Sequence, residues 1–247
     1  MSVVPRYDDA VAEWYDARMS GPASHRLTST LRALLGEARG GRCLDLGCGG
    51  GARAPMLRDL GWRVVGLDLA PAQLRVARRS GRLPAVMQAD AARLPLADNC
   101  LDAVASLVTH TDFDDWATAV GEVCRVLRPG RSFAYVGVHP CFVGPFAEAR
   151  DDGTRHLHQG YDDRRLRFEG PGLGDGLRSR VGVRHLPLAD LLNPVAAAGL
   201  GLGQFVELGD GLLPGLLGFA ATKPAGRCDH ENWIWPIFRE ALLLVIV

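Results

Sequence analysis

The fold of this chain is decided by the stretch Arg42-Cys43-Leu44-Asp45-Leu46-Gly47-Cys48-Gly49-Gly50-Gly51. Its first half is a short apolar run typical of a strand, and its second half is a run of glycines. Residues 52–60 then show helical spacing and stop at Gly61. Glycines between a strand and a helix let the backbone approach a ligand closely, because no Cβ intervenes. The stretch therefore predicts a ligand-binding turn at the carboxyl edge of a sheet.

Strand-like and helix-like segments alternate downstream of this turn. Strands are predicted at residues 62–69, 84–89, 100–107 and 132–138, and helices at residues 71–79 and 114–127. This alternation indicates an α/β fold with a parallel sheet and helices on both faces. Farther along the chain, the pattern predicts a helix at 188–198 and an antiparallel hairpin of strands 202–208 and 217–222.

Residues 139–185 break this rhythm, being rich in Gly, Arg, Asp and His. A long irregular stretch in a compact domain usually serves a function, so we expect a lid or substrate insert here. We expect one domain over residues 1–224, opened by a helical cap at 1–36. Residues 225–247 form an apolar tail that is too short and interrupted for a bilayer span of ~20 apolar residues. Packing on the domain, a homodimer contact or a weak membrane-surface anchor would each account for it.

Composition excludes several classes of protein. The 247 residues carry 28 basic and 28 acidic side chains, a balance that argues against a general nucleic-acid binder. The 6 cysteines contain no Cys-x-x-Cys pair and lie mostly in apolar runs, which favours buried thiols in a reducing cytoplasm. The N-terminal segment is charged throughout and lacks the apolar core of a signal peptide. We therefore expect a cytoplasmic protein whose partner is a small molecule.

Three carboxylates follow three of the predicted strands. Asp45 lies directly before the glycines, and Asp68 and Asp90 end the next two strands. The pattern Gly47-x-Gly49-x-x-Ala52 would also satisfy a dinucleotide fingerprint, which leaves an NAD-dependent oxidoreductase as an alternative. Asp45, however, would repel a pyrophosphate and suit a cation. A ligand with an ammonium group, a ribose diol and an adenine amine fits all three acids, and S-adenosyl-L-methionine (SAM) is such a ligand.

At this point the chain resembles the class I SAM-dependent methyltransferases, and among them the small-molecule (UbiE-like) enzymes. The resemblance rests on Cys43–Gly51 as the first motif, Leu67–Leu69 as the ribose position, Asp90-Ala91 as the adenine edge, Leu94–Val104 as the fourth-strand segment and Arg125–Gly130 as the turn before the fifth strand. It covers residues 40–138 in the family's order and spacing. It implies a Rossmann-like, doubly wound sheet of seven mostly parallel strands whose last strand is antiparallel.

The resemblance also implies how the cofactor is held. The loop glycines would approach its methionine and ribose parts, Asp45 would support the loop or the amine, and Asp68 would take the ribose hydroxyls. The adenine would lie between Leu69 and Ala91, with Asp90 on its amine. Tyr7 and Tyr15 of a predicted N-terminal helix, with His25 in the same cap, would close over the methionine end. The expected cofactor-binding residues are Asp45, Gly47, Cys48, Gly49, Gly51, Asp68, Leu69, Asp90, Ala91, Leu107 and Tyr15.

Methyl transfer from a sulfonium is an in-line displacement, so much of its catalysis is positioning and exclusion of water. A hydroxyl or protonated amine acceptor also has to lose a proton, and histidine is well tuned for this near neutral pH. His110 follows the fourth strand and His139 the fifth. Each is a candidate for the general base, and the alternative for each is a capping or hydrogen-bonded loop histidine.

The insert holds further histidines and several arginines. His156-Leu157-His158 could supply two metal ligands, but a third ligand at suitable spacing is missing. No metal site is therefore expected. His185 and Tyr161 also belong to this region. A solvated face is favoured over contact with an acidic substrate for the arginines Arg155, Arg164, Arg165 and Arg167.

These features favour a SAM-dependent methyltransferase that acts on a small, partly apolar molecule, most often at oxygen. Nitrogen and carbon acceptors stay open. A SAM-binding protein of the same fold that transfers no methyl group is the main alternative.

The ribose assignment gives a first prediction. Asp68→Ala should weaken SAM binding by ~1–3 kcal/mol, the scale of losing hydrogen bonds to a charged acceptor. Calorimetric titration measures the change, and an unaltered affinity would overturn the assignment.

Overall fold

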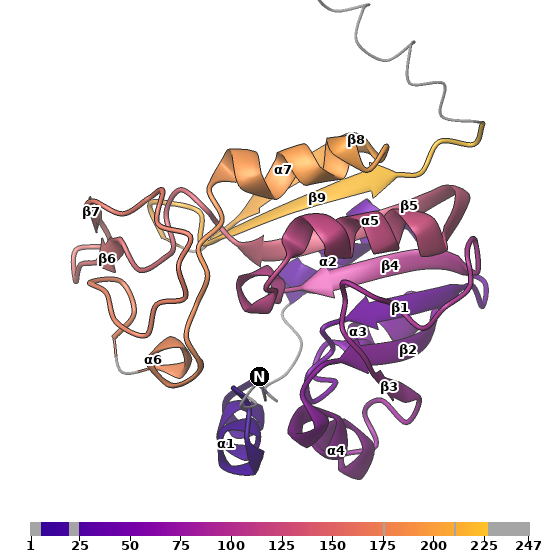
Figure 1. Cartoon of the computed structure of the whole chain (residues 1–247), viewed down its shortest axis with the longest axis horizontal. Coiled ribbons are helices and arrows are strands. Elements are labelled where there is room, and N and C mark those ends of the chain that lie inside the picture. Colours follow the sequence, from indigo (N-terminus) through magenta and orange to yellow (C-terminus); the bar gives the residue numbers. More distant parts are fainter. Residues whose placement is uncertain (1–5, 20–24, 175, 210, 227–247) are drawn as a thin grey trace, which may run out of the picture.

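The structure is a computed structural model that describes residues 6–19, 25–174, 176–209 and 211–226. Within these residues a seven-stranded sheet has the order β3-β2-β1-β4-β5-β9-β8 (Figure 1). Its strands are β1 (Arg42–Leu46), β2 (Arg63–Asp68), β3 (Val86–Gln88), β4 (Leu101–Leu107), β5 (Leu127–Val138), β8 (Gly201–Leu208) and β9 (Leu216–Thr222). The first five pair in parallel, and β9 runs antiparallel to both β5 and β8. The predicted doubly wound sheet with a reversed last strand is confirmed.

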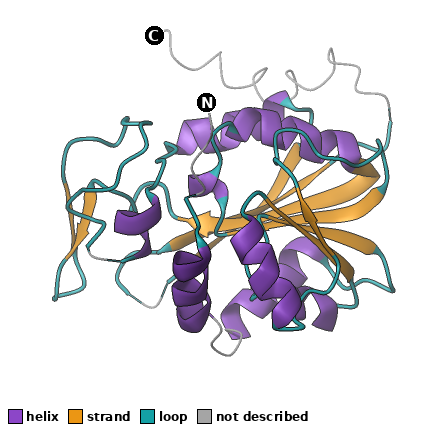
Figure 2. Ribbon diagram, turned by 60° about the horizontal axis from the view of Figure 1, so that its bottom comes forward, coloured by secondary structure: helices purple, strands orange, loops and turns teal. Residues whose placement is uncertain are grey.

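Helices cover both faces of this sheet (Figure 2). They are α2 (His25–Leu35), α3 (Ala54–Asp59), α4 (Pro71–Arg79), α5 (Trp116–Val126) and α7 (Leu188–Ala197). Successive residues of a strand point to opposite faces, so Ala103 and Ala105 of β4 pack with α2 and α3, whereas Val104 packs with α5 and α7. Burial on both faces explains why the fourth strand is a continuous apolar run.

The predicted boundaries agree closely with the observed ones. The helix predicted at 71–79 is α4 to the residue, with Pro71 in its first turn. The largest difference is at β5, which begins at Leu127 and so includes the turn predicted at Arg128–Gly130. The expected terminal hairpin is the β8–β9 pair.

The insert contains regular structure of its own. A small two-stranded sheet pairs β6 (Ala147–Ala149) with β7 (Arg155–Leu157), and the short helix α6 (Leu177–Val181) follows. Figure 1 shows these elements together on one side of the molecule, beyond the carboxyl ends of the central parallel strands. The region is therefore placed where an insert next to a ligand site would lie.

The N-terminal cap is two helices, of which α1 (Asp9–Met19) packs beside α4. Ion pairs join Glu13 to Arg79 at 3.2 Å and Asp16 to Arg82 at 2.5 Å. The prediction that Tyr7 lies in this helix was wrong, because α1 begins two residues later, at Asp9. His25 is the first residue of α2.

Most of the predicted apolar tail, residues 227–247, lies outside the described residues, so its packing or homodimer role stays a prediction. Among the helices that the structure describes, none has the length and apolarity to cross a bilayer.

The reversed strand β9 is anchored by Phe219, which gives a stability prediction. Phe219 is fully buried and stacks on Tyr135 with ring centroids 4.7 Å apart. Phe219→Ala should lower the free energy of unfolding by about 3–5 kcal/mol, the usual cost of emptying a buried aromatic site. Phe168→Ala, at a ring that is 45% exposed, is the control and should cost far less in the same denaturant titration. Equal losses in the two variants would contradict the assignment of Phe219 to the core.

Candidate functional site

The glycine loop after β1 follows a path that requires glycine. Gly47 and Gly49 have φ angles of 72° and 52°, where side chains are strained. A Cβ on Gly47 would lie 2.8 Å from the Thr109 side chain. Gly51 also has a positive φ, and a Cβ added to it would lie 2.9 Å from the Leu83 side chain. Gly51 does not line the cavity described below. The structure gives Gly51 a packing contact, and its approach to the cofactor stays a prediction.

Asp68, at the end of β2, ties the glycine loop to the next turn. One carboxylate oxygen accepts from the Gly49 N–H at 2.8 Å, and the other accepts from the Ala70 N–H at 2.8 Å. Burial raises the pKa of Asp68 to about 6, although these backbone hydrogen bonds act in the opposite direction. Each oxygen keeps a second lone pair, so the carboxylate can still accept from ligand hydroxyls.

Asp45, at the carboxyl end of β1, is a buried carboxylate with an unsatisfied oxygen. Its side chain is 2% exposed, and its Oδ2 has no hydrogen-bond partner among the described residues. Burial, and after it the charge of Asp68, raises the pKa of Asp45 to about 7. A buried acid of this kind is costly unless a cation or donor meets it. The position suits the positively charged end of a ligand.

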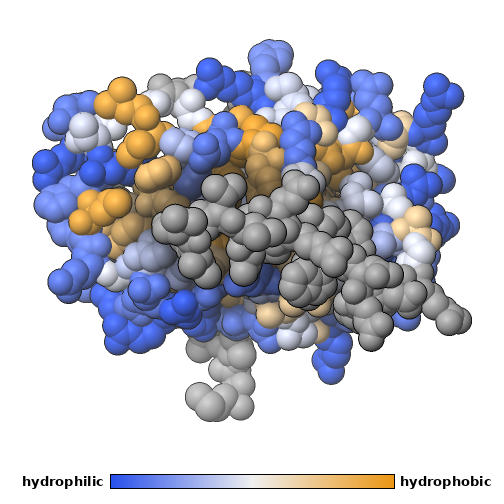
Figure 3. All heavy atoms as spheres, turned by 90° about the horizontal axis from the view of Figure 1, so that it is seen from above, coloured by the Kyte–Doolittle hydropathy of each residue, from blue (hydrophilic) through white to orange (hydrophobic). Residues whose placement is uncertain are grey.

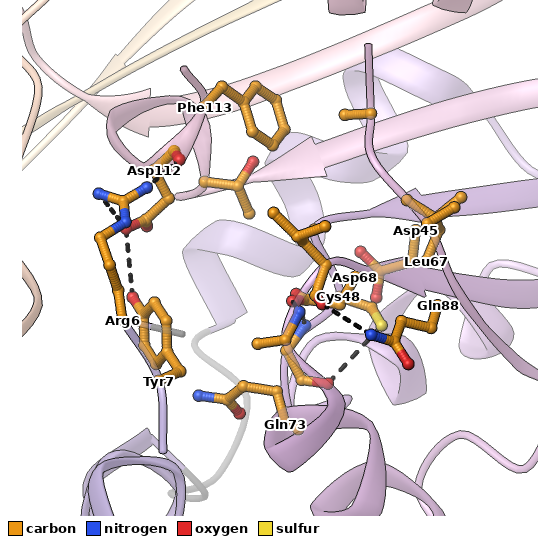
Figure 4. A pocket seen from close by; sticks show the side chains of 18 of the residues that line it. Arg6, Tyr7, Asp45, Cys48, Leu67, Asp68, Gln73, Gln88, Asp112 and Phe113 are labelled. Carbon is orange, nitrogen blue, oxygen red and sulfur yellow. Dashed lines mark hydrogen bonds and ion pairs between the residues drawn. The ribbon is translucent and has the colours of Figure 1, made fainter. Parts of the chain in front are cut away.

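These groups line one cavity of about 510 Å³ at the carboxyl edge of the sheet (Figure 4). Of the expected cofactor residues, its lining includes Asp45, Gly47, Cys48, Gly49, Asp68, Leu69, Asp90, Ala91, Leu107 and Tyr15. Leu69 is 57% exposed, which is unusual for a large apolar side chain. It therefore offers an apolar contact surface to a ligand in the cavity. The sequence-based reasoning missed Arg6, Arg53, Gln73, Thr109, Asp112 and Phe113.

Asp112 joins three separate segments at the mouth of the cavity. It lies in the 3-10 turn η1 (His110–Asp112) after β4. Its Oδ1 accepts from Arg178 of α6 at 2.7 Å and from the Tyr7 hydroxyl at 3.3 Å, and its backbone carbonyl accepts from Arg6. Figure 4 shows Arg6 and Tyr7 beside Asp112, across the cavity from Asp45 and Asp68. The N-terminal segment and the insert thus meet over the site.

A second contact joins α1 to the insert. The Trp14 ring makes cation–π contacts with two guanidinium groups, with Arg18 3.9 Å and Arg180 4.8 Å from its centroid. Burial raises the pKa of the Tyr15 hydroxyl on the same helix, so this side chain stays neutral at physiological pH. The cap therefore closes the site with neutral tyrosines and paired charges.

Neither histidine expected as the base lines this cavity. His110 is buried, with its Nδ1 2.7 Å from the Tyr135 hydroxyl, and burial lowers its pKa to about 3. His139 points elsewhere, with its Nε2 2.8 Å from Glu207 Oε1 on β8. The placement gives neither side chain access to the glycine loop, so a base role for them stays a prediction that this geometry does not favour.

His139 belongs instead to a second cavity of about 490 Å³ between β8, β9 and α7. Its lining is mainly apolar and includes Phe142, Leu192 and the half-exposed Phe205. Figure 3 looks onto the molecule from the side of α7 and β8, where apolar side chains gather among polar ones. The two histidines at the strand ends thus lie apart from the acids at β1 and β2.

The insert arginines are largely paired with acids of the chain itself. Arg164 contacts Asp190, and Asp163 pairs with Arg165 at 2.8 Å and with Arg167 at 3.4 Å. None of them lines the cavity at the glycine loop. These pairs agree with the prediction of a solvated face.

Comparison with known proteins places this site in a family. Residues 44–135 match the family model described as "Methyltransferase domain". The malonyl-[acyl-carrier protein] O-methyltransferase of Pectobacterium atrosepticum is 32% identical over 131 residues, 52% of this chain and 52% of that protein. The demethylmenaquinone methyltransferase of Thermus thermophilus is 38% identical over 111 residues, 42% of this chain and 50% of that protein. The chain thus spans about half the length of these curated relatives.

Solved structures extend the likeness to the whole fold. A SAM-dependent methyltransferase from Mesorhizobium loti superposes with a TM-score of 0.64 at 24% identity, covering 79% of this chain and 96% of that one. The [4+2]-cyclase SpnF superposes with a TM-score of 0.62 at 19% identity, covering 88% of this chain and 94% of the cyclase.

The strand order, the glycine loop after β1 and the acids after β2 and β3 define a Rossmann-like fold with a nucleoside-type site. Together with the matched family, they show that the chain carries a class I SAM-dependent methyltransferase domain, a class whose cofactor is S-adenosyl-L-methionine.

The buried acid beside the glycine loop predicts a pH-dependent stability. The ordinary pKa of Asp45 is 3.8, and its folded value is about 7. The penalty for ionising it in the folded state is absent below about pH 4, grows as the pH rises and is complete above about pH 7. Asp45→Asn should therefore raise the melting temperature of the ligand-free protein at pH 8 but not at pH 4, by roughly 2–4 °C per kcal/mol relieved.

Asp90→Asn is the matched control, because Asp90 lines the same cavity but is exposed. It should leave the melting temperature unchanged at both pH values. A gain for Asp45→Asn of equal size at pH 4 and pH 8 would contradict the assignment of a buried, costly charge.

Proposed function

We propose that this protein binds SAM in the cavity at the glycine loop and transfers its methyl group to an oxygen of a small molecule. The observation that carries the proposal is the unpartnered, buried Oδ2 of Asp45 in a cavity built from backbone glycines. A cation placed there regains the free energy lost by burying the carboxylate. SAM carries an ammonium and a sulfonium, whereas the phosphates of a dinucleotide would meet a like charge.

The remaining lining gives each part of SAM a partner of suitable chemistry. The Asp68 carboxylate accepts from the ribose diol. The exposed Leu69 side chain and Ala91 sandwich the adenine, and Asp90 accepts from its amine. Gln73 adds a buried, unpartnered side-chain oxygen at the loop, an acceptor for the ammonium group. At the charged end of SAM, this assignment uses two buried oxygens, Asp45 Oδ2 and Gln73 Oε1, that have no hydrogen-bond partner among the described residues.

The roof of the cavity supports a reaction that excludes water. Arg178 and Tyr7 both bind Asp112, so the insert and the N-terminal segment are tied together at the mouth. Burial acts to lower the pKa of Arg178, but the charge of Asp112, the nearby tyrosine hydroxyls and the hydrogen bond to Asp112 together outweigh it, so the pKa is raised and the guanidinium stays ionised. Closing the site in this way holds donor and acceptor in line and keeps water from the sulfonium.

Oxygen as the acceptor is supported by two observations. Arg6 and Arg53 both line the cavity, and the buried Arg6 Nη1, which lies 3.9 Å from Asp112 Oδ1, has no hydrogen-bond partner among the described residues. Such cations suit an acceptor that arrives with an ionised oxygen, for which no base is needed. One of the matched relatives is named as an O-methyltransferase, which agrees with this choice.

Removing the charge of Asp45 should have opposite effects on SAM affinity and on the stability of the ligand-free protein. Asp45→Asn should weaken SAM affinity about 10-fold or more, the loss of a hydrogen bond to a charged group, although it stabilises the ligand-free protein. Wild-type affinity should also fall as the pH drops below about 7, because protonation of Asp45 competes with the cation. Calorimetry with SAM, S-adenosylhomocysteine and NADH measures both effects. Tight NADH binding without SAM binding would overturn the proposal in favour of an oxidoreductase.

Transfer is tested separately with methyl-labelled SAM and a panel of small carboxylic acids and phenols. Alkali releases labelled methanol from a methyl ester but not from methyl ethers or from N- or C-methyl products. Labelled O-methyl products support the proposal. Tight SAM binding with no labelled product from the panel or from a cell extract would favour a SAM-binding protein without transfer, and stable N- or C-methyl products would overturn the oxygen assignment.

A further inference from the structure

The β6–β7 hairpin of the insert brings three metal-ligating side chains together. His156 and His158 are two residues apart, so their side chains point to the same face of the hairpin. Glu148 on β6 is the cross-strand partner of His156. The histidine pair thus gains the third ligand that its own stretch of sequence lacks.

The ligand atoms of these three residues are close enough to share one ion. One ligand atom from each lies within 4.8 Å of the other two, and His158 Nε2 is 2.8 Å from Glu148 Oε2. The two imidazole rings stack with centroids 4.3 Å apart and an interplanar angle of 12°. Metal–ligand bonds of ~2.0–2.2 Å around a tetrahedral ion place neighbouring ligand atoms roughly 3.3 Å apart. Because the ligand atoms lie within 4.8 Å of one another, the three side chains would have to rotate inward to hold an ion.

The donor set points to one class of ion. Two imidazole nitrogens and one carboxylate suit Zn²⁺ and similar divalent transition metals, whereas Mg²⁺ and Ca²⁺ prefer oxygen ligands. All three side chains are exposed or half-exposed, so an ion can reach them from solvent.

We propose that Glu148, His156 and His158 bind a Zn²⁺-type divalent ion that clips the two strands of the insert hairpin together. Each strand has three residues, and a two-stranded hairpin this short is marginally stable by itself. An ion bound to both strands in the folded hairpin adds its binding free energy to that of folding. Three protein ligands leave the fourth position to water.

Arg150 provides an internal test of this site. Its Nη2 lies 2.5 Å from His156 Nδ1. Because a guanidinium only donates, Nδ1 must accept, so this contact occupies one imidazole nitrogen and places a positive charge beside the site. Arg150 therefore competes with the ion, and removing it should improve binding, an effect that no purely structural role of the histidines predicts.

The experiment titrates Zn²⁺ into the full chain, prepared without an affinity tag, with a chromogenic chelator as competitor and Co²⁺ absorption as a second readout. We expect one ion per chain. His156→Ala and His158→Ala should each weaken it by more than ~10-fold, the lower end of the cost of losing even an outer-shell partner. Arg150→Ser should tighten it. His25→Ala, at an exposed histidine of α2 outside the insert, is the control and should leave the Zn²⁺ affinity unchanged.

Hydrogen exchange with and without Zn²⁺ then reports on the clip itself. Exchange of the amides of residues 147–158 should slow on binding, and Mg²⁺ should have no effect. Failure to bind one Zn²⁺ per chain would overturn the proposal. So would binding that persists unchanged in both His156→Ala and His158→Ala, which would place the ion elsewhere, or binding that leaves exchange in the hairpin unaltered.

Discussion

The bridge made by the Asp68 carboxylate is the interaction on which the site depends. It holds the N–H groups of Gly49 and Ala70, and so fixes the loop after β1 against the turn after β2. Both turns end parallel neighbours in the sheet, so one side chain sets the width of the cavity between them. The glycine conformations follow from this, because the loop has to bend closely around Thr109 to stay within reach. A loop held by a buried, charge-assisted contact is preorganised for a ligand before one arrives.

The same geometry makes the ionised form of Asp45 costly in the ligand-free protein. Two carboxylates end adjacent strands in a region shielded from water, where burial and the charge of Asp68 raise the cost of ionising Asp45. A chain selected for stability alone would place an apolar residue or a paired acid at this position. The unpaired oxygen is consistent with a ligand that completes the electrostatics, in the way that functional sites often trade stability for binding. It also explains why balanced overall charge is uninformative here, since the decisive charges are local.

The sheet and most of the cofactor cavity could be predicted from the sequence because both depend on local patterns. Apolar runs define the strands, and a ligand-binding turn lies after the strand where the glycines stand. The histidines after β4 and β5 could not be placed in the same way. Val108 has a positive φ of 61°, and the chain then turns so that His110 is buried against Tyr135. His139 is drawn aside by Glu207, a residue 68 positions away. Strand order predicts the edge of a sheet, but not which cavity a side chain faces.

The third ligand of the hairpin escaped sequence reasoning for a related reason. Glu148 is a neighbour of the histidine pair only through the cross-strand register of β6 and β7, which depends on the turn between them. The family match, moreover, ends at residue 135, before the insert begins. The matched residues therefore support cofactor binding, whereas Arg178 and the hairpin lie in the part of the chain that the family model does not cover. What the insert admits lies outside the range of the family model, so the acceptor is inferred first from Arg6 and Arg53 of the cavity lining.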